Sequence, residues 1–274
     1  MAAIDTGSDD LLADITDGVC TLTMNRPERR NAMSGGMLGA MVRMLERCET
    51  DHEVRCVVLT GAGGAFCAGG DVKGMDESNS SGASRAPGID ERIHAQRLQQ
   101  RATSGRLHMM PKPTIAMIPG AVAGAGLGLA LSCDLRVMAD SAIMTTAFAK
   151  VGFAGDYGGT YFLTQLVGTG KARELYFLSD KISAAECERL GIVNRVVPAE
   201  SLEPATMEWA QTLAAGPAVA YRYMKENLNR ALAGDMTECL DLEATHHVHT
   251  GLTEDHKSAV RAFVEKRPPT FVGR

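Results

Sequence analysis

The chain has 274 residues, 45% of them hydrophobic and 22% charged, with a formal net charge of -5 at pH 7. This composition is typical of a globular protein that buries a core without disulfides or metals, and it lacks the basic excess that nucleic-acid binding requires. The seven cysteines include no C-x-x-C pair, and residues 1–10 are polar and acidic, unlike a signal peptide. The cysteine pattern argues against a metal site. No apolar run is long enough to span a bilayer, so we expect a cytoplasmic protein with no membrane partner.

The first third of the chain alternates short β-rich runs with helical stretches. Residues 18–25 (GVCTLTMN) and 54–60 predict strands, and Ser34 begins an amphipathic helix that continues to about Glu49. Methionines recur at helical spacing in this segment, which indicates a face that packs on the core: Met33, Met37, Met41 and Met44.

A low-complexity stretch over residues 78–87 (SNSSGASRAP) predicts a mobile loop rather than a linker between domains. After it the pattern predicts, in order, a helix over 89–109, a strand over 112–118, a helix over 129–132 and a strand over 134–139. From Thr160 the pattern is mainly helical, over 160–166, 170–178 and 183–190, with a brief strand over 192–197 and helices beyond. The order predicts an α/β core over residues 1–200 and a helical region over 201–274 of the same domain.

Two glycine-rich loops follow the strands over 54–60 and 112–118. They are residues 66–71 (FCAGGD) and 120–128 (GAVAGAGLG). Small residues let a backbone approach a ligand closely, and the start of a helix directs unpaired N–H groups at negative charge. Side by side, two such loops would form an oxyanion hole with two backbone donors.

A dinucleotide-binding loop is the competing interpretation, because glycine-rich turns after strands also hold pyrophosphates. The G-x-G-x-x-G spacing fails at both candidates, however. Leu129 stands where the third glycine should follow Gly124 and Gly126, and the run from Gly61 fails in the same way at Phe66. We therefore expect no nucleotide cofactor.

Together the loops resemble the enoyl-CoA hydratase/isomerase (crotonase) superfamily, over about residues 18–271. The supporting segments are 25–32 (NRPERRNA), 66–71, 112–120 (KPTIAMIPG), 124–130 (GAGLGLA), 133–136 (CDLR), 158–160 (GGT) and 263–267 (FVEKR). The resemblance implies a crotonase-like spiral of ββα units, with C-terminal helices that build homotrimers commonly paired into hexamers.

The resemblance also implies site residues. It assigns the oxyanion donors to the backbone N–H groups of Ala68 and Ala125, a role that alanine allows because the side chain takes no part. It implies an acyl-CoA substrate, whose coenzyme A is part of the substrate and not a separate cofactor. The implied contacts to coenzyme A are Arg29, Ala32, Ala68, Gly69, Gly70 and Asp71, with Phe263 and Lys266 supplied by a neighbouring subunit.

The chain departs from the family's hydratases at the catalytic carboxylates. Those enzymes use two glutamates to activate water, and the matching positions here are Gly128 and Phe148. What remains is Asp156, two residues before Gly158, which resembles the branch in which a single aspartate serves, including enoyl-CoA isomerases and the epoxide isomerase of phenylacetate breakdown. One carboxylate can move a proton between two carbons while the hole holds the enolate, which is isomerase chemistry.

Several alternatives stay open. Asp156 could instead be a helix cap or a turn former, or a nucleophile as in another branch of the family. A hydratase or a thioester hydrolase on the same scaffold is possible if Asp156 activates water, and a non-catalytic acyl-CoA-binding subunit would keep the oxyanion hole without turnover. We expect Tyr157, beside the predicted base, to touch the substrate.

Other candidates have simpler interpretations. Among the histidines at 246, 247 and 249, His246 and His249 lie three residues apart on one helical face, but no third suitably spaced ligand is nearby. A solvated or interface helix surface is therefore favoured over a metal site. Cys67 lacks a positioned histidine and is expected to be a small buried side chain. We expect structural hydrogen bonds from Asp71 and Asp134, and an adaptable acyl pocket is the alternative to core packing for Met109, Met110 and Met117.

Overall fold

The computed structural model describes residues 2–71 and 88–274, so the predicted loop over 78–87 lies outside the described residues. Its main layer is a seven-stranded sheet in the order β1-β2-β3-β4-β6-β8-β11. The first three strands pair antiparallel and the others parallel. The strands are β1 Ala2–Ile4, β2 Leu11–Thr16, β3 Val19–Met24, β4 Cys56–Gly61, β6 Thr114–Ile118, β8 Leu135–Ala139 and β11 Arg195–Val197.

A second sheet has four short strands in the order β10-β9-β7-β5. They are β5 Ala65–Cys67, β7 Ala121–Ala123, β9 Ile143–Thr145 and β10 Ile182–Ser183. Each of β4, β6 and β8 is followed by a strand of this second sheet and then by helix, so the chain repeats a ββα unit. The repetition confirms the predicted α/β fold of ββα units, and it places the ends of β5 and β7 side by side.

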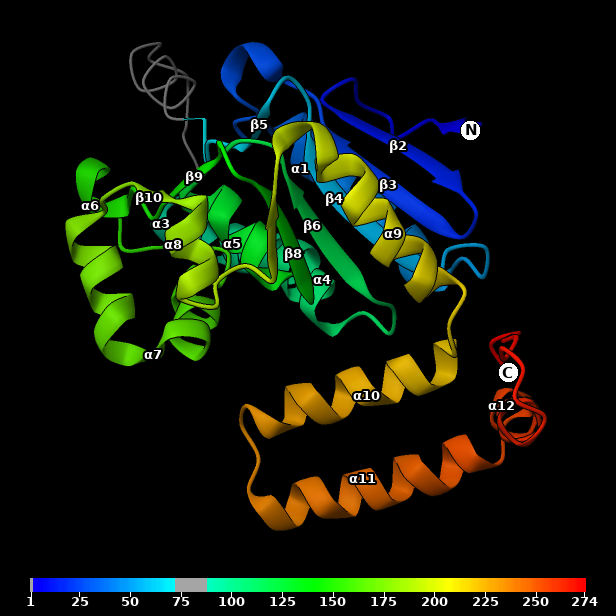
Figure 1. Ribbon diagram of the computed structural model, residues 1–274. Helices are drawn as coiled ribbons and strands as arrows, with labels where there is room; N and C mark the ends of the chain where they lie inside the picture. The colour runs from blue at the N-terminus through cyan, green and yellow to red at the C-terminus, as the bar shows by residue number, and fades with distance from the viewer. Residues whose placement is uncertain (1, 72–87) are drawn as a thin grey trace.

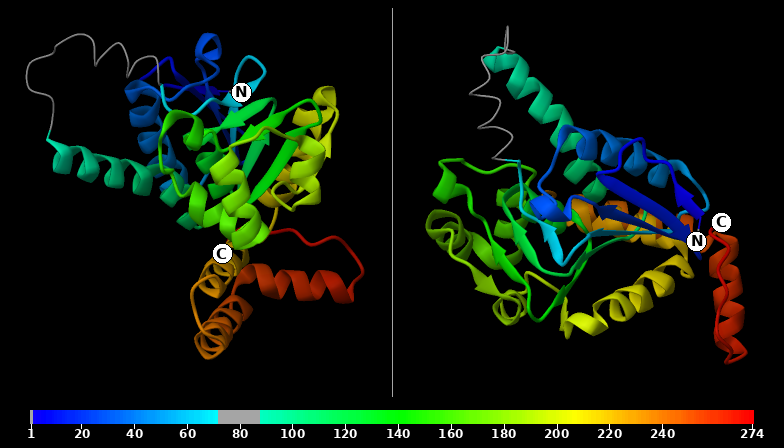
Figure 2. Two further views of the ribbon diagram at one scale, coloured as in Figure 1. Left: turned by 90° about the vertical axis from the view of Figure 1, so that its left-hand side faces the viewer. Right: turned by 90° about the horizontal axis from the view of Figure 1, so that it is seen from above.

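Helices cover both faces of the large sheet. Helix α1 (Gly35–Thr50) lies on one face and α9 (Leu202–Ala214) on the other, as Figure 1 and the view from above in Figure 2 show. Ser34 caps α1 by accepting a hydrogen bond from the N–H of Met37, and the four predicted methionines are all buried. Short helical segments connect the longer elements: η1 Pro27–Arg29, α6 Phe148–Val151, α8 Ala184–Arg189 and η3 Ala199–Ser201.

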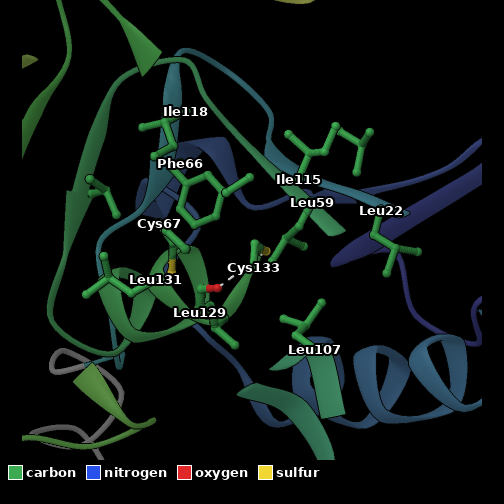
Figure 3. Packing of buried hydrophobic residues seen from close by; sticks show 14 of the residues in the cluster. Leu22, Leu59, Phe66, Cys67, Leu107, Ile115, Ile118, Leu129, Leu131 and Cys133 are labelled. Carbon is green, nitrogen blue, oxygen red and sulfur yellow. Dashed lines mark hydrogen bonds between the residues drawn. The ribbon is translucent and has the colours of Figure 1, made fainter. Parts of the chain in front are cut away.

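The core continues into α5 (Gly124–Ser132), every residue of which is buried. Figure 3 shows Leu129 and Leu131 of this helix packed with Phe66 and Cys67 of β5. Four of the nine residues in α5 are glycine or serine, and their small size lets the helix pack closely on the strands around it. The helix predicted over 129–132 therefore begins five residues earlier, directly at the glycine loop.

The helix predicted over 89–109 is continuous but changes its winding. It consists of α3 (Ile89–Gln100), a π-helical turn η2 (Arg101–Gly105) and α4 (Arg106–Met109). Single π turns inside α-helices are frequent at functional sites. Thr103 and Ser104 of this turn are buried, and their hydroxyls donate to the carbonyls of Gln99 and Gln100.

Helix α7 (Gly159–Leu178) contains a non-helical residue at Gly168, which matches the two helices predicted on either side of it. The last helices are α10 (Ala218–Ala231), α11 (Met236–Gly251) and α12 (Glu254–Val264). They stand away from the sheets as an arm (Figure 1), whereas α9 packs on the large sheet. Within the described ranges, no helix combines the length and apolar content needed to cross a bilayer.

Candidate active site

The two glycine loops meet at Gly69 and Ala125. Gly69 has φ +95°, and a Cβ atom placed on it would lie 3.1 Å from the carbonyl oxygen of Ala123 and 3.3 Å from the nitrogen of Ala125. A Cβ on Gly126 would lie 2.6 Å from both Cβ and the carbonyl oxygen of Cys67. Glycine is therefore required on both sides of this junction, and the predicted meeting of the loops is observed.

Ala125 presents a free N–H group at this junction. It is the second residue of α5, so its amide precedes the first residue that can bond within the helix, and the described residues give it no hydrogen-bond partner. The helix dipole adds partial positive charge at the same end. This amide can stabilise an oxygen on which negative charge develops.

The N–H group of Ala68, the other predicted donor, is occupied in this structure. It donates to the carbonyl oxygen of Arg30 at 2.9 Å. Arg30 and its neighbour Asn31 both have left-handed backbones, with φ +50° and +56°. The buried Asn31 amide fixes this turn by donating to the carbonyls of Ala62 and Ala65, each at 2.9 Å. Ala68 can serve as an oxyanion donor only if its N–H is shared with, or released by, Arg30.

Asp156 lies half-buried in a strained turn before α7. Gly155 and Gly158 have φ +113° and +76°, and Tyr157 between Asp156 and Gly158 has φ +48°. The N–H of Tyr157 donates to Gln100 Oε1 at 2.7 Å, which ties the turn to the helix end at η2. A non-glycine residue in the left-handed region costs free energy and persists only where its surroundings hold it.

The carboxylate of Asp156 has no structural partner that explains it. Its Oδ1 atom is buried without a hydrogen bond among the described residues, and α7 begins without a side-chain cap. The helix-cap alternative is therefore wrong for this structure. Burial raises the pKa of the Asp156 carboxyl to about 6, within the range useful for a general base.

The turn of Asp156 packs directly on the helix that carries Ala125. A Cβ on Gly128 would lie 2.8 Å from the carbonyl oxygen of Tyr157 and 3.2 Å from that of Asp156. Gly128 follows Ala125 by three residues on the same face of α5, about 4.5 Å along the helix axis. The backbone of the turn that carries the predicted base therefore lies against the helix that carries the free amide.

The two positions that carry glutamates in the family's hydratases hold no carboxylate here. Gly128 has no room for a side chain, because the backbone of Tyr157 occupies that space. Phe148 is buried and stacks on Tyr176, with ring centroids 5.8 Å apart and 9° between the planes. Packing therefore leaves no space for a glutamate at position 128, and a stacked aromatic ring occupies position 148.

The structure brings some of the predicted coenzyme A contacts to the junction and leaves others remote. Gly70 bridges to Met33, Ala32 is buried, and Asp71 forms an ion pair with Arg26 at 3.0 Å, as expected of a structural carboxylate. Arg29 lies in the turn beside them. Phe263 and Lys266 lie on or after α12 in the arm, and Phe263 is 83% exposed.

The remaining candidates have structural roles. Cys67 is buried, its thiol donates to the carbonyl of Asn31 at 3.0 Å, and burial raises its pKa to about 12, which suits an inert side chain. Asp134 Oδ2 bonds Lys225 at 2.9 Å and Thr114, as expected.

The methionines predicted either for the core or for an acyl pocket have different environments. Met110 is fully buried, and with the exposed Met109 it lines a cavity of about 420 Å³ between α4, α7 and α10. Met117 packs against the core of the large sheet.

Of the predicted solvated or interface surface of the histidine cluster, His246 takes the interface part. It is buried between α10 and α11, with Nδ1 2.6 Å from Asn227 Oδ1 and its ring 4.2 Å from that of Tyr223. His247 and His249 are exposed, as expected. Within the described residues, no group of three potential ligands is arranged to hold a metal ion.

The buried carboxylate predicts a stability difference. Because the folded pKa of Asp156 lies above the ordinary value near 4, the folded state binds the proton more tightly, and stability falls as pH rises from about 4 to about 6. At pH 8, Asp156→Asn is therefore expected to have a free energy of unfolding roughly 1 kcal/mol higher than that of wild type, after discounting for partial exposure, and so a higher unfolding temperature. At pH 4 the two proteins should not differ. Thermal unfolding at both pH values checks this, and equal melting temperatures at pH 8 would contradict it.

Comparison with known proteins agrees with this geometry. The family model described as enoyl-CoA hydratase/isomerase matches residues 14–274. The chain belongs to this family. It therefore has the crotonase-type fold and is an acyl-CoA enzyme of this family.

Individual relatives carry both kinds of name. The chain is 35% identical to the 1,2-epoxyphenylacetyl-CoA isomerase of Escherichia coli, over 96% of this chain and 98% of that protein. It is 33% identical to a probable enoyl-CoA hydratase of Rhodobacter capsulatus, over 95% and 97%. A crystal structure of a putative enoyl-CoA hydratase/isomerase from Mycobacterium abscessus superposes with a TM-score of 0.89 at 31% identity, over 96% and 100%. The family is shared, but its hydratase and isomerase branches are both represented.

Proposed function

We propose that this protein is an acyl-CoA isomerase in which Asp156 carries a proton between two carbons of the acyl group. The observation that carries the proposal is the buried Oδ1 atom of Asp156, which has no hydrogen-bond partner in the described chain, in a turn that packs on the helix with the free amide. In this proposal the free amide stabilises the negative charge on the thioester oxygen, and the carboxylate transfers the proton.

In the proposed mechanism the thioester carbonyl oxygen accepts a hydrogen bond from the N–H of Ala125, and from Ala68 once Arg30 shares or releases that group. Asp156 removes a proton from the carbon next to the carbonyl. The negative charge moves to the thioester oxygen, where preorganised donors stabilise it, and each such donor is worth roughly 3 kcal/mol in related sites. The protonated carboxyl then returns the proton to the γ carbon, and the double bond has moved.

The surroundings of Asp156 suit a base that must be regenerated. A pKa near 6 leaves the carboxylate ionised at neutral pH yet basic enough to accept a proton. Positions 128 and 148 are glycine and phenylalanine, so neither supplies a second carboxylate to hold a water opposite Asp156. This arrangement favours movement of a proton over addition of water.

Binding of the coenzyme A moiety belongs to the same proposal. Arg29, Ala32 and the loop over 68–71 would contact it on one side, Tyr157 would contact the acyl group, and Phe263 and Lys266 would close over it from a neighbouring subunit of a trimer. No cofactor other than the substrate's own coenzyme A enters the mechanism.

The proposal is tested by incubating the wild-type protein with 2-enoyl-, 3-enoyl- and aromatic acyl-CoA thioesters and resolving the products by chromatography and mass. A product of unchanged mass and shifted double bond is expected. A gain of one water would identify a hydratase, release of free coenzyme A a hydrolase, and binding without product a non-catalytic subunit. Each of those three outcomes would replace the isomerase assignment.

A further inference from the structure

Tyr176 is a half-buried residue next to the Asp156 turn, and no contact explains its hydroxyl. Its Oη atom is buried and has no hydrogen-bond partner in the described ranges. Leaving a buried hydroxyl unpaired costs free energy, and a phenylalanine would fill the same space without that cost. The sequence offered no motif that singles out this tyrosine, which lies 20 residues beyond the predicted base.

Two glycines on either side of Asp156 make room for this hydroxyl. A Cβ atom on Gly159 would lie 2.6 Å from Tyr176 Oη, and one on Gly155 would lie 3.1 Å from Tyr176 Cε1 and 3.6 Å from Oη. The phenol thus occupies the space that side chains at 155 and 159 would fill. Its hydroxyl therefore lies against the backbone that carries Asp156.

The ring itself is held in place by Phe148. The two rings are stacked, and Phe148 extends from α6 towards the glycine loop, with its Cε1 4.0 Å from the position of a Cβ on Gly124. Burial, with a smaller contribution from the charge of Asp156, raises the pKa of Tyr176 well above its ordinary value. The phenol is therefore neutral at physiological pH and available as a hydrogen-bond donor.

We propose that Tyr176 is a positioning residue, whose O–H donates to the carboxylate of Asp156 through one bound water. This inference rests on the proposed function, because it takes Asp156 as the base. The proposal pairs the unpartnered donor Oη with the unpartnered acceptor Oδ1. A hydrogen bond to the ionised carboxylate favours that form and fixes its orientation.

The other titratable groups near the carboxylate are few. Among the described residues, the charge of Asp156 contributes to the raised pKa of the Tyr157 and Tyr176 phenols, and the Cys67 thiol acts on that of Tyr157. The shift at Asp156 itself has burial as its cause. Removing the Tyr176 hydroxyl is therefore expected to change the titration of Asp156 without a competing ionic partner.

The test is Tyr176→Phe, which keeps the stack on Phe148 and removes only the hydroxyl. We expect kcat to fall about tenfold with little change in KM, and the acid limb of the kcat/KM profile to move up by roughly one pH unit. The infrared C=O band of protonated Asp156 is identified by its loss in Asp156→Asn. The pH midpoint at which this band disappears should move up by the same amount, in a measurement that needs no turnover. Tyr161→Phe, which alters an exposed tyrosine of the same helix, should change neither readout.

Gly159→Ala is a second, independent variant, because its methyl group would displace Oη while leaving the tyrosine in the chain. It should reproduce the upward shift of the pH midpoint of the infrared band. An unchanged acid limb and an unchanged band in Tyr176→Phe would overturn the role of Tyr176. If Asp156→Asn still abolished turnover in that case, the proposed function would stand alone, whereas full activity of Asp156→Asn would remove the proposed function itself.

Discussion

Asp156→Asn is expected to lower kcat for double-bond migration by about 10²–10⁴-fold while KM changes only a few-fold. The amide has nearly the shape of the carboxylate but cannot accept a proton, so the loss belongs to proton transfer and not to packing or binding. Steady-state kinetics with a 3-enoyl-CoA substrate measures it. The acid limb of the wild-type kcat/KM profile should fall near pH 6, because the ionised carboxylate is the active form.

Asp180→Asn is the matched control, because Asp180 is an exposed aspartate beyond the end of α7. It should retain wild-type kcat. A wild-type rate in Asp156→Asn would mean that another group moves the proton, and an equal loss in both variants would point to a general effect of charge.

Gly128→Glu, which restores one glutamate of the hydratase pattern, is expected to destabilise the protein and to produce no hydratase. Its Cβ would lie 2.8 Å from both Cβ and the carbonyl oxygen of Tyr157, and α5 is buried throughout. Overpacking against backbone and burial of a charge should together cost at least about 3 kcal/mol. Thermal unfolding and assays for water addition measure the two effects.

Gly170→Glu is the control, since a Cβ at Gly170 meets nothing within 4 Å and the residue is exposed. It should unfold close to the wild-type temperature. A stable Gly128→Glu protein that hydrates 2-enoyl-CoA would show that the Tyr157 turn can move aside, and that the single carboxylate is not enforced by packing.

The sequence predicted the long elements well because their signals are local. The Ser34 cap and the methionine stripe determine α1, and the glycine at 168 separates the two halves of α7. The strands of the second sheet could not be located from sequence periodicity, because β5, β7 and β9 have three residues each, too few for an alternating pattern to emerge. Those strands form because ββα units stack, which is a property of the whole chain.

The site was predictable in its parts and not in its contacts. Glycine content indicated the meeting of the loops at Gly69 and Ala125, and spacing before the G-G-T segment indicated Asp156. The bond from Ala68 to Arg30 was not predictable, since it depends on left-handed backbones at two non-glycine residues. Tyr176 reaches the site only because α7 folds back over the Asp156 turn.

The most direct test of the central claim is the fate of label during a single turnover of 3-enoyl-CoA carrying deuterium at the carbon next to the carbonyl. If Asp156 alone removes and returns the proton, part of the deuterium should appear at the γ carbon of a 2-enoyl product that has gained no oxygen. A product that has gained a water, or complete loss of deuterium to solvent with equal turnover by Asp156→Asn, would contradict a single-carboxylate isomerase.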